Sequence, residues 1–179
     1  RELLEDAKWN LLQHAIMVAG RRFAENENSL IITALDGATA TTTGGATISV
    51  NNITTAMQGI EDDDYTPTSF VVGFEVLNDL RNLDTFVEAD KLGSTRVIEG
   101  GFIGRMYGMN VFRVSTNAGA TTTSAYVYDN KNAFVMVEKR PITVENFELP
   151  AYDTSAASIT QRITVATLRA ASIQKITTT

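Results

Sequence analysis

Three groups of residues in this sequence are of types that can do chemistry: a glycine cluster, a lone histidine and an acidic run. The glycines lie in GGFIGRMYGMNVFRVS, residues 100–115. Glycine-rich loops bind phosphate where they open a helix, because backbone N–H groups then point at the anion. Here the spacing fits neither a dinucleotide fingerprint nor a P-loop, and an alternating apolar strand follows. The pattern favours a structural turn, with Gly101, Gly104 and Gly108 as the turn residues.

His14 is the only histidine of the chain, and the chain has no cysteine. A protein metal site normally combines several histidine, cysteine or carboxylate ligands, so a lone histidine is a weak start. A small hydrolase that uses His14 with a carboxylate is an alternative, but no G-x-S-x-G elbow accompanies it. We therefore predict no catalytic residue, no metal site and no cofactor, and a structural or surface role for His14.

The acidic run Glu61, Asp62, Asp63, Asp64 has the charge of a cation site. A calcium loop needs acidic residues at alternate positions, a central glycine and a distal glutamate, because the loop must wrap its oxygens around one ion. The run lacks that spacing. It predicts a solvated acidic turn.

The overall charge limits the partners. The chain of 179 residues carries 15 Lys and Arg against 21 Asp and Glu, a formal net charge of -6. Such a surface repels a phosphate backbone unless basic residues are segregated, and the longest basic runs are the pairs Arg21-Arg22 and Lys139-Arg140. We predict no specific nucleic-acid recognition. No apolar run approaches the length of a membrane span, so no membrane partner is predicted.

The elements that must position these residues begin with helices. Apolar residues at helical spacing predict a long helix from Arg1 to about Glu25. A short strand at Leu30–Leu35 and a loop rich in glycine and threonine are expected next. A short helix capped by Asn51 or Asn52 and a second amphipathic helix in GFEVLNDLRNLDTF follow.

The second half of the chain is mostly strand. Residues with β-branched or aromatic side chains and partial alternation occur in NVFRVS, AYVYD, AFVMVEKR, ITVENFEL and SITQRITVATLRAASIQKI. Helices first and strands later indicate an α+β fold and not a regular βαβ array.

Three stretches in this order resemble a known family. They are TPTSFVVGFEVLNDLRNLDTF, then IEGGFIGRMYGMNVFRVSTNAG, then AFVMVEKRPITVENFELPAYDTSAASITQRITVATLRAASIQKI. Together they resemble the major capsid protein of tailed bacteriophages, with the Hong-Kong-97-like fold that encapsulin shells also use. The resemblance implies an α+β fold with a long spine helix, an axial domain of mixed sheet and helices, and a long β-hairpin in a peripheral domain.

The resemblance also implies a division of the chain. Residues 1–28 would be the spine helix of the peripheral domain, 29–139 the axial domain, 140–164 the peripheral β-hairpin, and 165–179 a return strand and tail. The family pattern places an arm and an extended loop before the spine helix. Since this chain opens on Arg1 without methionine, we expect a further portion of the protein upstream.

The function implied by the resemblance is structural and not enzymatic. The chain would self-assemble into pentamers and hexamers of an icosahedral shell that encloses a DNA genome, in a virion assembled in the host cytoplasm. Scaffold, portal and decoration proteins are the further partners that it implies, and an encapsulin-type compartment is the alternative. The subunit contacts placed by this resemblance are Asp90, Lys91, Arg96, Trp9, Phe23 and Tyr152.

Overall fold

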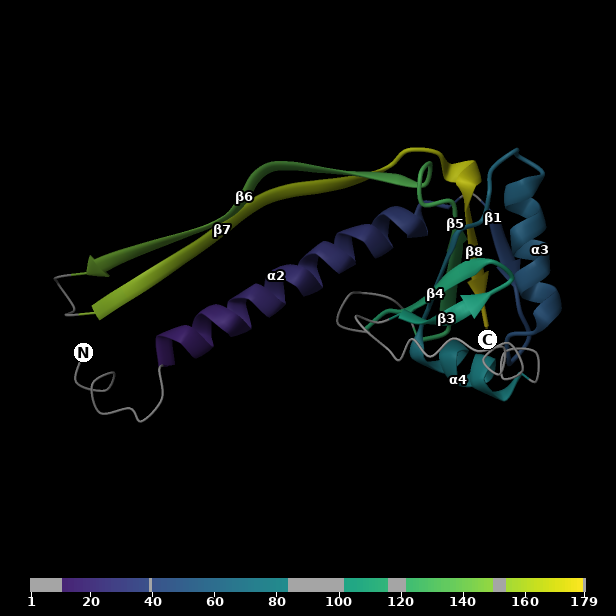
Figure 1. Ribbon diagram of the computed structural model, residues 1–179, viewed down its shortest axis with the longest axis horizontal. Helices are drawn as coiled ribbons and strands as arrows, with labels where there is room; N and C mark the ends of the chain where they lie inside the picture. The colour runs from purple at the N-terminus through teal and green to yellow at the C-terminus, as the bar shows by residue number, and fades with distance from the viewer. Residues whose placement is uncertain (1–10, 39, 84–101, 116–121, 150–153, 179) are drawn as a thin grey trace. The chain divides into compact units, whose positions relative to one another are not determined.

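The computed structural model describes residues 11–38, 40–83, 102–115, 122–149 and 154–178 (Figure 1). The chain divides into two units. The first, which we call the hairpin unit, comprises Arg1–Glu27 and Met136–Thr164. The second, the sheet unit, comprises Asn28–Val135 and Val165–Thr179. Each unit is described by itself below.

Helix α2 spans Leu11–Asp36 and contributes to both units. The prediction of a strand at Leu30–Leu35 is wrong, because these residues continue helix α2. Ile32 and Leu35, three residues apart, are both buried in the core of the sheet unit, and no glycine or proline lies between Gly20 and Gly37. A short apolar run fits a strand or a buried helix equally well, and here burial on one helical face decides it.

The sheet unit is built on a mixed six-stranded sheet with the order β1-β8-β5-β2-β4-β3. Its strands are β1 Ala40–Thr43, β2 Ser69–Val72, β3 Phe102–Met106, β4 Met109–Arg113, β5 Ser124–Tyr128 and β8 Ile173–Thr177. Strands β1 and β8 are parallel, as are β2 and β4, and the other neighbours are antiparallel. The threonine-rich segment expected as loop contains β1, because pairing with β8 gives its backbone groups partners.

Two helices cover one face of this sheet, α3 at Val50–Glu61 and α4 at Phe74–Asn82 (Figure 1). Alternation along the central strand β5 sorts its side chains between two cores. Ala125 and Val127 join the core beneath α3 and α4, whereas Tyr126 and Tyr128 join the core beneath the C-terminal part of α2. The sheet therefore lies between helices on both faces.

The cap of α3 differs from the expected one. Ser49 is the N-cap, and its side chain accepts a hydrogen bond from the backbone N–H of Asn52 at 3.3 Å. The Asn52 side chain accepts in return from the Ser49 backbone N–H at 3.0 Å. Asn52 thus completes a capping box and is not itself the cap.

The hairpin unit combines the N-terminal part of α2 with a two-stranded sheet of β6, Phe134–Leu149, and β7, Thr154–Thr167. The stretches AFVMVEKR and ITVENFEL, expected as separate strands, form the single strand β6. Figure 1 shows α2 running beside this hairpin. The 3-10 turn η3, Ala170–Ser172, links β7 to β8. The fold is α+β, as the sequence predicts.

Candidate functional site

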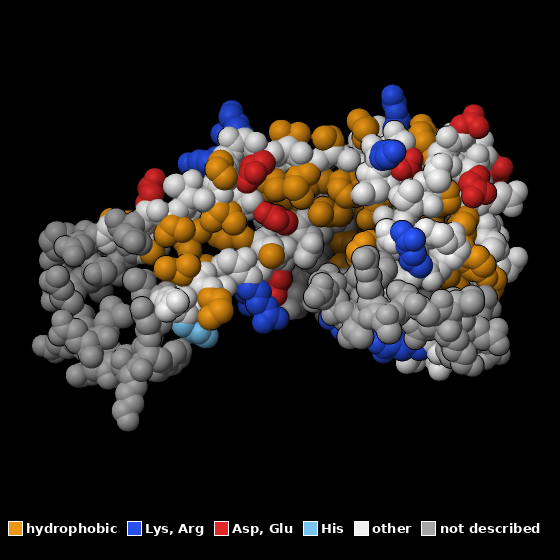
Figure 2. Space-filling model, viewed as in Figure 1, with side chains coloured by type: hydrophobic (Ala, Val, Ile, Leu, Met, Phe, Trp, Pro, Cys, Tyr) orange, Lys and Arg blue, Asp and Glu red, His pale blue; other side chains and the backbone are white. Residues whose placement is uncertain are grey.

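Exposed apolar side chains follow strand β6 of the hairpin unit (Figure 2). Each is between 42% and 52% exposed. We call them the β6 surface; they are Met136, Val137, Ile142, Val144 and Phe147. A cluster of this kind, on one strand, marks an interaction surface more often than scattered exposed apolar residues do.

Both faces of β6 contribute to this surface. Successive side chains of a strand point to opposite faces, so the neighbours Met136 and Val137 face opposite ways and are nevertheless both exposed. On β7 the pattern differs, because Ile159 and Ile163 are half-buried while Arg162 between them is exposed. Neither face of β6 is therefore fully covered by a core at these positions.

A hydrogen bond joins α2 to strand β7 of the hairpin. The Gln161 side-chain Nε2 donates a hydrogen bond to Glu27 Oε1 at 2.5 Å. Among the described residues, Gln161 Oε1 is the one buried side-chain nitrogen or oxygen atom without a hydrogen-bond partner. Helix α2 is therefore tied to β7, while the apolar residues of the β6 surface stay exposed.

Charged residues and a proline interrupt the β6 surface. Glu138, Lys139 and Arg140 are exposed and are followed by Pro141, which has no N–H to donate. Charges and proline on an edge strand discourage unspecific pairing with other strands. The interruption therefore allows a specific partner and opposes aggregation.

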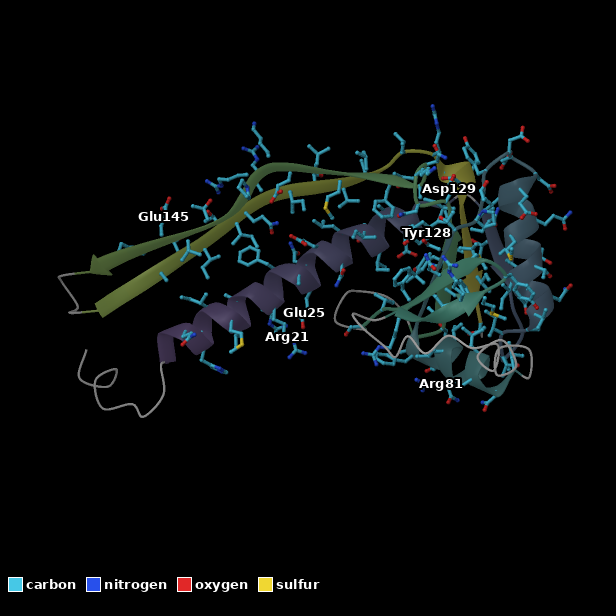
Figure 3. The ribbon with its side chains drawn as sticks, in the orientation of Figure 1. Arg21, Glu25, Arg81, Tyr128, Asp129 and Glu145 are labelled. Carbon is cyan, nitrogen blue, oxygen red and sulfur yellow. The ribbon has the colours of Figure 1, made fainter. Side chains whose placement is uncertain are left out.

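The outer side of α2 carries two further exposed apolar residues, Met17 and Val18. Nearby, Arg21 Nε lies 3.4 Å from Glu25 Oε1, and Arg22 Nη1 lies 2.9 Å from Glu25 Oε2 (Figure 3). Both arginines are well exposed, and ion pairs of this kind add little to stability. Among the described residues of this part of the helix, none belongs to a buried core.

A polar cluster in the sheet unit joins the end of α2 to the sheet. Asp36 Oδ1 accepts a hydrogen bond from Tyr126 Oη at 2.8 Å and forms an ion pair with Lys175 Nζ at 2.6 Å. Burial raises the pKa of Tyr126 above its ordinary value, and the hydrogen bond and negative charge of Asp36 raise it further. The cluster keeps Tyr126 neutral and anchors the helix, which is a structural task.

The turn after β5 holds a buried carboxylate, Asp129 (Figure 3). Its side chain accepts hydrogen bonds from the Lys131 backbone N–H at 3.0 Å and from Asn132 Nδ2 at 2.6 Å. Burial also raises the pKa of the preceding Tyr128, and a hydrogen bond with Ser69 lowers it in part. These buried polar groups are engaged in closing a turn and are not arranged around a reacting group.

The turn glycines lie at different places. Gly108 is the second residue of the two-residue loop between β3 and β4, with φ 84, which favours glycine. Gly104 lies within β3 beside a register shift, and a Cβ built there would meet nothing within 4 Å. Phe23 is half-buried on α2. The remaining predicted residues lie outside the described residues: Gly101, Asp90, Lys91, Arg96, Trp9 and Tyr152.

The predicted chemical residues are not brought together. His14 is exposed on α2, and Glu61 to Asp64 are exposed at the end of α3. Among the described residues, no three His, Cys, Asp or Glu side chains are grouped as a metal site. In the same part of the chain, no helix is long and apolar enough to cross a membrane.

Sequence reasoning missed the β6 surface. The available signal was the run Val135-Met136-Val137, since consecutive apolar residues on a strand of a two-stranded sheet cannot all face one core. That signal becomes readable only once β6 and β7 are known to pair with each other alone.

Comparison with known proteins identifies the family. A model of the phage capsid protein family matches residues 1–176. The chain belongs to that family. This phage capsid protein is accordingly a structural subunit of a virion capsid. No curated protein matches the capsid protein in a sequence comparison.

Solved structures share its fold at low sequence identity. A structure of Mycobacterium phage Adephagia matches with a TM-score of 0.75 and 13% identity, over 100% of this chain and 68% of that one. The capsid of an empty GTA particle matches with a TM-score of 0.72 and 15% identity, over 99% and 69%. The holo-SrpI encapsulin complex of Synechococcus elongatus PCC 7942 matches with a TM-score of 0.71 and 9% identity, over 97% and 68%. The capsid protein therefore has the Hong-Kong-97-like α+β fold that its sequence resembles.

Proposed function

We propose that this capsid protein builds its shell through the β6 surface, which neighbouring copies cover in the assembled particle, and that it performs no catalysis. The observation that carries the proposal is the exposure of apolar residues on both faces of β6. Permanent assemblies bury large apolar surfaces, and the chain belongs to a family of capsid proteins.

The architecture of the hairpin supports this role. An isolated two-stranded hairpin is at best marginally stable in water. Strands of 16 and 14 residues are also longer than most strands of globular proteins. A neighbour that covers β6 would add apolar burial to the cover that α2 already gives to β7.

We assign the hairpin unit to the peripheral domain of the family fold and the sheet unit to the axial domain. The sequence-based division, residues 1–28 and 140–164 as peripheral against 29–139 and 165–179 as axial, differs from these units by one residue on α2 and four on β6. Axial contacts around pentamers and hexamers would use Asp90, Lys91 and Arg96. Peripheral contacts would use Trp9, Phe23 and Tyr152 beside the β6 surface.

The finished shell would enclose a DNA genome without recognising its sequence. The net charge of -6 supports this, since an acidic wall does not hold DNA by its phosphates. Assembly would take place in the host cytoplasm, with scaffold, portal or decoration proteins as further partners.

A double substitution on the β6 surface tests the proposal. Ile142→Thr with Val144→Thr keeps β-branched side chains, and thus strand propensity, while it removes apolar contact area. The critical concentration for shell formation by the full-length protein should rise about tenfold, because an interface residue of this size contributes on the order of 1 kcal/mol. The melting temperature of the unassembled protein should change by less than about 2 °C, since both side chains are already half exposed.

Leu168→Thr is the matched control, because Leu168 is 50% exposed but lies in the sheet unit after β7. It should leave the critical concentration unchanged within about twofold. Sedimentation velocity and negative-stain electron microscopy measure shell formation by the double variant and by the control. Unaltered assembly of the double variant would remove the β6 surface from the shell contacts, and a wild-type protein that stays monomeric under shell-forming conditions would refute the whole proposal.

An encapsulin-type compartment is the second candidate, favoured by the match to the holo-SrpI encapsulin complex. The contents of purified particles separate the two functions. Packaged double-stranded DNA indicates a virion, whereas a defined protein cargo without genomic DNA indicates a compartment.

A further inference from the structure

The β3–β4 hairpin ends in a loop whose sequence does not suit its backbone. The loop consists of Tyr107 and Gly108, between the paired residues Met106 and Met109. Both loop residues have positive φ, 49 for Tyr107 and 84 for Gly108. Such two-residue loops strongly prefer Asn-Gly or Asp-Gly, and a bulky residue with positive φ is strained.

The side chain of Tyr107 gives its own subunit little in return for this strain. It is 43% exposed, whereas Met106 and Met109 on either side are buried in the core of the sheet unit. The loop base is also braced, because Arg105 Nε donates a hydrogen bond to Asn110 Oδ1 at 3.0 Å. The fold therefore presents an exposed aromatic ring at the tip of a hairpin whose flanking residues are anchored in the core.

We propose that Tyr107 is a contact residue that packs against a second copy of this chain in the shell. This inference rests on the proposed shell function and adds a contact in the sheet unit, separate from the β6 surface. Strain in a loop persists where the surrounding structure enforces it and where function benefits. Tyrosine and arginine are both enriched at the centres of protein interfaces.

The family of the chain favours a second copy as the partner, because a capsid shell is built from many copies of its subunit. Each copy carries a net charge of -6, so contacts between copies need apolar area or a basic patch to offset repulsion. The loop offers the Tyr107 ring as apolar area, and Arg105, two residues before it, is an exposed cation. A tyrosine ring also loses little side-chain entropy on binding, because few bonds rotate.

Tyr107→Asn tests the inference because it should move two measurements in opposite directions. Asparagine accepts a positive φ, so the melting temperature of the unassembled full-length protein should rise by about 2 °C. Loss of the ring should raise the critical concentration for assembly about tenfold. Tyr107→Phe is the matched control, since it keeps the ring and the strain and should leave both measurements near the wild-type values.

Each other outcome overturns the inference. Normal assembly of Tyr107→Asn would show that no second copy uses the ring, while the β6 experiment would still decide the proposed function. A lower melting temperature for Tyr107→Asn would show that the ring packs within its own subunit. Wild-type protein that forms no shell would refute the proposed function and this inference together.

Discussion

At the scale of single residues, the cluster of Asp36, Tyr126 and Lys175 is the best-defined polar feature of the sheet unit. Asp36 is the last residue of α2, where a negative charge opposes the helix dipole. The ion pair with Lys175 at 2.6 Å offsets that charge, and the hydrogen bond from Tyr126 occupies the same oxygen. The three residues together fix the end of the helix on β5 and β8.

The raised pKa of Tyr126 makes the stability of the sheet unit sensitive to alkali. The folded state favours neutral tyrosine, so this stabilisation is complete below the ordinary pKa of 10.0 and is lost as pH rises through the higher folded pKa. The melting temperature of the wild-type protein should therefore fall above about pH 10. The melting temperature of Tyr126→Phe should fall less steeply with pH, because phenylalanine does not titrate. Thermal denaturation from about pH 8 to about pH 11 measures the slopes.

Tyr65→Phe serves as the control for the alkaline experiment, because Tyr65 lies only partly buried beside the other core. It should keep the wild-type slope. Part of the slope should persist in Tyr126→Phe, since burial also raises the pKa of Tyr128. Equal slopes for wild type and Tyr126→Phe would contradict the role of Tyr126.

The turn glycines show how far residue-level prediction reaches. Gly108 occupies a loop position with φ 84, where its lack of a side chain has a clear use. Gly104 has room for a Cβ and lies in β3, so the described fold gives no reason for glycine there. Sequence spacing identified a turn region but did not distinguish the two positions, because φ and free space depend on the folded backbone.

At the scale of elements, the capping box of α3 is a local device with a measurable effect. Ser49→Ala removes the acceptor for the Asn52 backbone N–H and should destabilise the protein by about 1 kcal/mol. For a chain of this length the melting temperature should fall by about 2–4 °C. Differential scanning calorimetry of the unassembled protein measures the change.

Ser49→Asp is the matched variant for the cap, since aspartate also accepts from the helix N-terminus. Its melting temperature should stay near the wild-type value. If Ser49→Ala and Ser49→Asp melt alike, the side-chain cap does not contribute, and α3 depends on its packing against the sheet alone.

The elements also divide into those that local sequence predicts and those that it does not. Helix α4 and strands β4 and β5 lie where apolar periodicity indicates them. The helical state of Leu30–Leu35 and the strand β1 were not predicted. Both depend on distant partners, since α2 ends against the sheet and β1 pairs with β8 from the far end of the chain.

At the scale of the whole molecule, the net charge of -6 opposes association of identical copies. Salt screens this repulsion, whereas salt weakens apolar contacts very little. Raising NaCl from about 50 mM to about 500 mM should therefore lower the critical concentration for assembly several-fold. Light scattering at a series of protein concentrations measures the critical concentration.

KCl at the same ionic strength is the control for the salt experiment, because screening does not depend on which monovalent cation is present. Both salts should give the same curve. A critical concentration that rises with salt would show that ion pairs, and not apolar contacts, dominate the shell interfaces.

The sequence by itself determined the order of helices and strands, the α+β class and the resemblance to phage capsid proteins, because apolar periodicity and turn residues act over short stretches of chain. Only the tertiary structure decided which apolar residues are core and which are surface. Ile32 is buried and Val144 is exposed although both are apolar, because burial depends on which distant segment lies opposite. The exposure of the β6 surface and the positive φ of Tyr107 belong to this second class, because exposure depends on which segments cover a strand and φ depends on the folded backbone.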